Sequence, residues 1–89
     1  MSTSKKGELE KALEYFEETL KIFKEIGSRI EIALTLVNIG DIFVQKGDKK
    51  RALDYYREAK PLAEGSSVFD GVSELLENLE KEQNANNDR

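Results

Sequence analysis

Eighteen aspartate and glutamate side chains are the most numerous groups in this sequence that could act as acids, bases or metal ligands. Many of them lie three or four residues from another charged residue, as Glu10 does from Glu14 and Glu17 from Lys21. Such rows are typical of solvated helix faces with modest ion pairing. A catalytic carboxylate pair needs a pocket and two well-separated pKa values, and the sequence predicts neither.

The side chains that most often carry catalysis near neutral pH are missing, because the chain contains neither histidine nor cysteine. It therefore lacks the commonest general base and the commonest metal ligand. Disulfides, thiolate nucleophiles and zinc–thiolate sites are also excluded. Glycine-rich phosphate loops and nucleophile motifs are absent as well. We predict a protein that is not an enzyme and has no metal site and no cofactor.

Charge and hydropathy limit the partners and the compartment. The net charge of −4 opposes binding to nucleic acid or to an anionic membrane. Nowhere do eighteen consecutive apolar residues occur, so no segment is expected to span a bilayer. Residues 1–6 lead into a charged segment without the apolar core of a signal peptide. We therefore predict a cytoplasmic protein that binds neither membrane nor nucleic acid.

The elements that must position any site come from a recurrence. Residues 7–16 and 47–56 carry nearly the same pattern: a glycine, an acid, a base, alanine, leucine, an acid and two aromatics. A fixed period of this length indicates stacked helical units that cannot bury their apolar faces alone. The recurrence predicts an all-α fold of four antiparallel helices, stacked in pairs rather than closed as a symmetric bundle. We expect the helices at 8–26, 29–46, 49–64 and 67–83.

Glycines and capping residues set the expected helix boundaries. Gly27, Gly47 and Gly65 each follow a helix and suit a left-handed C-terminal cap. At the N-termini, Ser28 with Glu31 and Ser67 with Asp70 have capping-box spacing, and Asp48 is expected to cap the helix between them. The tail at 84–89 has no large apolar residue, so we predict disorder there.

The helix at 29–46 is predicted to be the centre of the packing, because it is apolar almost all round. Gly40 lies in its interior and costs about 1 kcal/mol of helix propensity. We expect it to permit a close helix–helix approach, with Ala52 as the neighbour. Pro61 should kink or end the third helix, because it removes a hydrogen bond to the Arg57 carbonyl. The helix at 67–83 has one apolar stripe and an acidic remainder, as a terminal cap should.

Two further groups of side chains have a structural and a functional interpretation. Tyr15, Tyr55 and Tyr56 could stack on a ligand, but at helical spacing they are expected to be packing residues. The basic residues at the turn before the third helix could contact an acidic surface, although a solvated turn is the simpler interpretation. These residues are Lys46, Lys49, Lys50 and Arg51.

These motifs resemble the tetratricopeptide repeat family. The resemblance lies in Leu36-x-x-Ile39-Gly40-x-x-Phe43, a turn at Gly47, and then Ala52-x-x-x-Tyr56-x-x-Ala59. It implies a single domain at 5–83, with a half repeat at 8–26, a full repeat at 29–64 and a capping helix at 67–83. The period is forty residues rather than the thirty-four usual in the family, which indicates a long-repeat variant.

The resemblance implies protein binding through a concave groove lined by the helix at 29–46. The positions that match groove residues are Leu34, Val37, Asn38, Asp41 and Gln45. In peptide-binding relatives, an asparagine at the place of Asn38 binds the main chain of the ligand. Asp41 stands where a carboxylate-binding groove would need basic residues, so recognition of a C-terminal carboxylate is not expected.

The alternative function is self-assembly, as in a homodimer, through apolar surface on the helix at 8–26. One and a half repeats fall short of the roughly three that such folds usually need. The main arc of this helix is formed by Leu9, Ala12, Leu13, Phe16, Leu20 and Phe23, and Tyr15, Thr19, Ile22 and Ile26 extend it. A fragment of a longer repeat protein would leave the same surface open.

Overall fold

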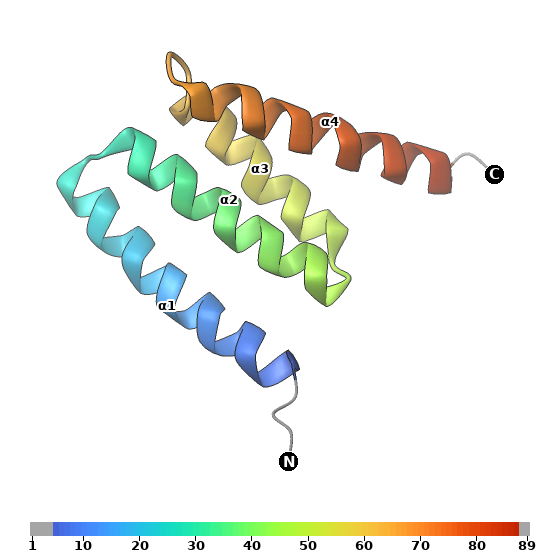
Figure 1. Ribbon diagram of the computed structural model, residues 1–89, viewed down its shortest axis with the longest axis horizontal. Coiled ribbons are helices and arrows are strands. Elements are labelled where there is room, and N and C mark those ends of the chain that lie inside the picture. Colours follow the sequence, from blue (N-terminus) through green and yellow to red (C-terminus); the bar gives the residue numbers. More distant parts are fainter. Residues whose placement is uncertain (1–4, 88–89) are drawn as a thin grey trace.

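The fold is a flat layer of four helices, seen in a computed structural model that describes the backbone of residues 5–87 and the side chains of residues 7–83. The helices are α1 (Lys5–Ile26), α2 (Arg29–Lys46), α3 (Lys49–Leu62) and α4 (Ser67–Asn87). They follow one another in space in the order of the sequence (Figure 1), and the layer measures 43 × 39 × 17 Å. No strand occurs in residues 5–87, which confirms the all-α prediction.

The three turns have the glycine geometry that the sequence predicts. Gly27, Gly47 and Gly65 have φ angles of 83°, 88° and 88°, in the left-handed region. After α2, the Gly47 amide donates to the Val44 carbonyl at 3.0 Å and the Asp48 amide to the Phe43 carbonyl at 2.8 Å. The turn thereby satisfies carbonyl groups that the end of a helix leaves without partners.

The N-terminal caps differ from the prediction at two of the three helices. Asp48 caps α3 as expected, since its side chain accepts from the Arg51 amide at 3.3 Å. Ser28 precedes α2 but makes no capping hydrogen bond with its side chain, so the capping box predicted there is wrong. At α4 the capping side chain is Ser66, one residue earlier than predicted. Its hydroxyl accepts from the Val68 amide at 3.2 Å and donates to the Ala63 carbonyl at 2.8 Å.

Two helices end at other residues than expected. α3 ends at Leu62, one residue after Pro61 and two before the predicted end at 64, because the proline ring removes a donor from the last turn. α4 continues beyond 83 to Asn87, through part of the segment for which we predict disorder. Extending an existing helix is easier than nucleating one, and residues 84–87 contain no glycine or proline to stop it. Residues 88–89 of the predicted tail lie outside the described residues.

The core is built around α2, which adjoins all three other helices, as predicted. The side chains of Leu36 and Ile39 on α2 are 1% and 0% exposed, and Tyr56 on α3 is 2% exposed. α4 contributes Val72, Leu76 and Leu79 to the same core, while its acidic side remains exposed. The fully buried centre of the molecule therefore lies between α2, α3 and α4, and α1 covers only one flank of α2.

Candidate functional site

The residues predicted for the groove share one side of α2, because their spacing returns to the same side of a helix every three or four residues. They are Leu34, Val37, Asn38, Asp41 and Gln45, called the α2 face below. Leu34 is 42% exposed, and Asn38 and Gln45 are also exposed. Val37 and Asp41 are half-buried. The structure thus brings all five predicted residues together on the accessible side of an otherwise buried helix.

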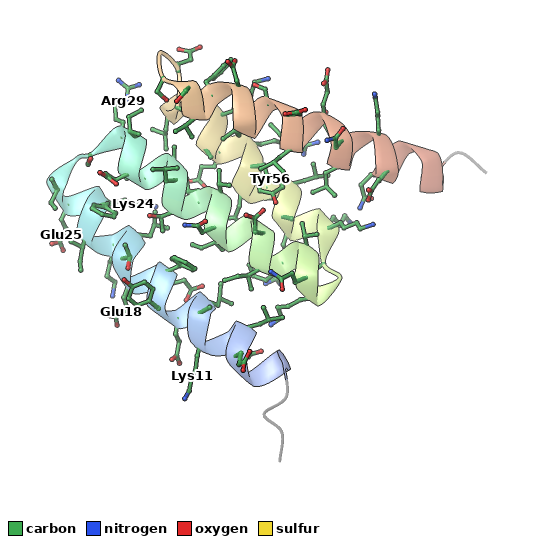
Figure 2. The ribbon with its side chains drawn as sticks, in the orientation of Figure 1. Lys11, Glu18, Lys24, Glu25, Arg29 and Tyr56 are labelled. Atoms are coloured by element: carbon green, nitrogen blue, oxygen red, sulfur yellow. The ribbon has the colours of Figure 1, made fainter. Side chains whose placement is uncertain are left out.

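The Asp41 carboxylate accepts a hydrogen bond from a residue of α3. Tyr56 on α3 lies buried among the helices (Figure 2), and its hydroxyl donates a hydrogen bond to the Asp41 carboxylate. The ring crosses α2 at Gly40, where an added Cβ would lie 2.6 Å from Tyr56 Cε1 and 2.9 Å from Cδ1. The side chain nearest to that position is therefore Tyr56, four residues after the predicted neighbour Ala52, and the predicted close approach of the helices is present.

Tyr56 stays protonated throughout the neutral range. Burial raises the pKa of the Tyr56 phenol, and both the hydrogen bond to Asp41 and the negative charge of that carboxylate raise it further. The phenol therefore acts as a fixed donor to Asp41. The pKa of Tyr55 is also raised, first by burial and then by the nearby charge of Glu17 on α1. Sequence reasoning missed the link between Tyr56 and Asp41, because it depends on how α3 is placed against α2.

The predicted self-association residues on α1 are half-buried. Leu13, Phe16, Leu20 and Phe23 pack against the core, and Leu9 and Ala12 are also only partly exposed. The apolar side chains left uncovered are those that extend the arc. Tyr15 is 67%, Ile22 55% and Ile26 68% exposed. With the half-buried Thr19 they form a single row along α1, called the α1 stripe below.

The tyrosines do not all behave as predicted. Tyr56 is a core residue, and Tyr55 stacks on Phe43 with ring centroids 5.5 Å apart. Tyr15 is exposed and contacts Phe16 edge-on at 5.4 Å, so the prediction that it packs inside the fold is wrong.

Two of the four basic residues at the turn before α3 form ion pairs between helices instead of being merely solvated. Lys46 pairs with Glu10 on α1 at 2.9 Å, and Lys49 pairs with Glu82 on α4 at 2.7 Å. Lys46 and Arg51 also lie over the Phe43 ring, each 5.9 Å from its centroid. These pairs are partly exposed, so each contributes no more than about 1 kcal/mol. The cluster has a structural use that the sequence pattern did not predict.

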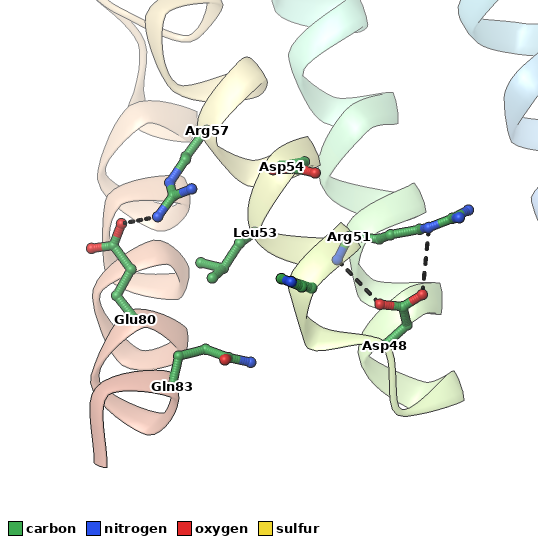
Figure 3. A pocket seen from close by; sticks show the side chains of 8 residues that line it. Asp48, Arg51, Leu53, Asp54, Arg57, Glu80 and Gln83 are labelled. Carbon is green, nitrogen blue, oxygen red and sulfur yellow. Dashed lines mark hydrogen bonds and ion pairs between the residues drawn. The ribbon is translucent and has the colours of Figure 1, made fainter. Parts of the chain in front are cut away.

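A recess of about 720 Å³ lies between α3 and α4 (Figure 3). Its lining includes three basic and three acidic side chains, namely Lys50, Arg51, Arg57, Asp48, Asp54 and Glu80. Arg57 pairs with Glu80 at 3.1 Å and Arg51 with Asp48 at 3.5 Å. The lining charges balance and partly neutralise one another, so the recess presents no excess charge to a ligand.

The described part of the chain contains neither a cluster of metal ligands nor a membrane-spanning helix. No group of three or more acidic residues there could hold a metal ion together. None of the described helices combines the length and apolarity that crossing a membrane requires.

Comparison with known proteins agrees with the helical architecture. The sequence model of the tetratricopeptide repeat family matches residues 2–65. The photosystem I assembly protein Ycf3 of Prochlorococcus marinus (strain NATL1A) is 38% identical over 53 residues. That alignment covers 60% of this chain and 29% of Ycf3, so the chain spans less than a third of the relative's length. No solved structure matches the chain.

Proposed function

The chain belongs to the tetratricopeptide repeat family, whose members typically mediate protein–protein interactions, and we propose that it is a non-catalytic module that binds another protein through the α2 face. The ligand is a helical or extended segment of the partner. The observation that carries the proposal is the placement of Leu34, Asn38 and Gln45 on the exposed side of a helix whose other sides are buried. The name of the relative Ycf3, an assembly protein, is in keeping with such a role.

The α2 face contains both kinds of group that segment recognition requires. Leu34 and Val37 offer apolar area, and Asn38 has an amide that can both donate to and accept from a ligand main chain. Because α2 is packed on three sides by the other helices, the face is presented on a rigid element. A rigid face loses little conformational entropy on binding, which favours affinity.

A double substitution tests this function. Asn38→Ala with Asp41→Lys should weaken capture of the partner from the source cell by at least about tenfold. Asn38 is exposed, but Asp41→Lys removes the acceptor of the buried Tyr56 hydroxyl, so the variant should fold with a stability lower by roughly 1–3 kcal/mol. The measurement is affinity capture by the tagged chain followed by titration of the captured protein, with circular dichroism as the folding control. If capture survives both changes in a folded variant, the α2 face is not the site.

Self-association through the α1 stripe is the second candidate function. The observation that favours it is the row of apolar side chains at Tyr15, Ile22 and Ile26, each more than half exposed. Contiguous exposed apolar surface on a small protein normally belongs to an interface. The two functions are compatible, since the α1 stripe and the α2 face lie on different helices.

A further inference from the structure

Asp41 is a half-buried carboxylate that has no cationic partner among the described side chains. The ion pairs in that part of the chain join Lys46 to Glu10, Lys49 to Glu82, Arg51 to Asp48 and Arg57 to Glu80. Asp41 takes part in none of them, and its hydrogen bond comes from the neutral Tyr56 hydroxyl. A partly desolvated charge is poorly screened by salt and interacts more strongly with an opposite charge than an exposed one does.

The hydrogen bond from Tyr56 prepares Asp41 to receive a cation. It occupies one carboxylate oxygen and fixes the orientation of the group, while the other oxygen remains an acceptor. Tyr56 is itself immobilised, because it is 2% exposed and its ring lies against Gly40. A ligand cation would therefore meet a carboxylate that is already in place, without the entropy loss of ordering a mobile side chain.

The rest of the α2 face determines which cation fits. Leu34 is 42% exposed and lies seven residues before Asp41, which is two helical turns or about 10.5 Å along α2. No basic residue is part of the face, because the two in α2 are Arg29 and Lys46 at its ends. The net charge of the whole chain, −4, also attracts a positively charged segment.

We propose that the segment bound by the α2 face carries a lysine or arginine that pairs with Asp41, and an apolar side chain that packs on Leu34. The separation of the two contacts sets the ligand pattern. A helical ligand would place its cationic and apolar residues seven apart. An extended ligand in the polyproline II conformation would place them three apart, since three residues make one turn and span about 9 Å. This inference rests on the proposed function and specifies the chemistry of its ligand.

The probe for the test is a phage-displayed library of random peptides, selected against the whole chain. The strongest binders are synthesised, and their Kd values are measured with the wild type and with Asp41→Asn. Asparagine keeps an acceptor for the Tyr56 hydroxyl while it removes the charge. The matched control is Asp54→Asn, the same change at an exposed position on α3. Thermal melting of each variant checks that it is folded.

The selected peptides should contain lysine or arginine, three or seven residues from an apolar residue. Asp41→Asn should raise their Kd by about tenfold, whereas Asp54→Asn should change it by less than about twofold. When the peptide's basic residue is replaced with glutamine, the peptide should bind Asp41→Asn and the wild type with the same Kd. This is the result that a double-mutant cycle requires if the two charges interact directly.

Two other outcomes distinguish a failure of this inference from a failure of the proposed function. If Leu34→Ser and Asn38→Ala weaken the peptides but the binders lack the basic residue, or Asp41→Asn has no effect, this inference is overturned while the proposed function stands. If Leu34→Ser and Asn38→Ala leave every peptide bound, the α2 face is not the binding surface and both proposals fail.

Discussion

The side chain of Tyr56 connects the core of the molecule to the α2 face. Its ring is buried between α2 and α3, and its hydroxyl reaches the carboxylate of Asp41. The ring fits there because Gly40 has no Cβ, so the α2 backbone can approach it closely. The glycine lowers the helix propensity of α2 by about 1 kcal/mol, and the close packing offsets that loss. Tyr56 thus fixes both the spacing of α2 and α3 and the position of the Asp41 carboxylate.

Gly40→Ala should therefore destabilise the fold, although alanine is the better helix former. Its Cβ would lie 2.6 Å from Tyr56 Cε1, and the ring cannot move aside without losing its hydrogen bond. We expect the free energy of unfolding in urea to fall by roughly 1–3 kcal/mol, as for other overpacked cores. Gly71→Ala on α4 is the control, because its Cβ would meet nothing within 4 Å. The free energy of unfolding of Gly71→Ala should rise by up to about 1 kcal/mol. Equal gains in both variants would show that Gly40 is not tightly packed.

At the scale of the helices, the sequence predicted well what depends on neighbouring residues. Glycine punctuation located the turns at Gly27, Gly47 and Gly65, and apolar periodicity identified the four helices. Features that depend on three-dimensional placement were missed. Ser66 rather than Ser67 caps α4 because of how the preceding turn is folded. The neighbour of Gly40 depends on the alignment of α3 against α2, which no local pattern specifies.

In the candidate site, too, features set by spacing along one helix were predicted, and features set by contacts between helices were not. The family spacing on α2 located the residues of the α2 face, and the structure places them together on one side of that helix. The role of Tyr56 beneath Asp41 was not predicted, because the two residues are on different helices, fifteen positions apart. On α1 the periodicity predicted a wide apolar arc, but it did not predict which residues of that arc α2 covers and which remain exposed.

α1 should be the least stable helix of the fold. It adjoins α2 alone, and its apolar side chains are at most half-buried. Native-state hydrogen exchange should give α1 amides free energies of opening at least roughly 1 kcal/mol below those of the α2 interior, because elements with little buried area open locally. Amides of Leu36 and Ile39 in the core of α2 provide the reference. If α1 and α2 amides exchange with the same free energy, α1 unfolds only with the whole molecule and the prediction is wrong.

The two edges of the whole molecule differ in polarity. Both helices expose carboxylates, but α4 adds to Asp70, Glu74 and Glu77 only one large exposed apolar side chain, Leu75, whereas α1 adds the α1 stripe. Head-to-tail stacking would press this stripe against carboxylates and desolvate them without partners, which is unfavourable. A two-fold arrangement instead packs one α1 stripe against another. The spacing of the stripe suits this arrangement, because its intervals of four, three and four residues read the same in both directions.

In such an antiparallel pairing, Tyr15 would face Ile26 of the second copy and Thr19 would face Ile22. We therefore expect light scattering across a concentration series to show a closed dimer at high micromolar concentration and no larger assembly. Ile22→Glu should give a monomer at every concentration while retaining the melting temperature of the dissociated wild type, because Ile22 is 55% exposed. Phe16 is unsuitable for this test, since it packs against the core and its replacement would unfold α1.

Asn78→Glu on α4 adds the same charge at an exposed position away from α1 and should leave the dimer intact. A wild-type chain that is monomeric at high micromolar concentration, or that grows into open-ended filaments, would contradict a two-fold contact through α1.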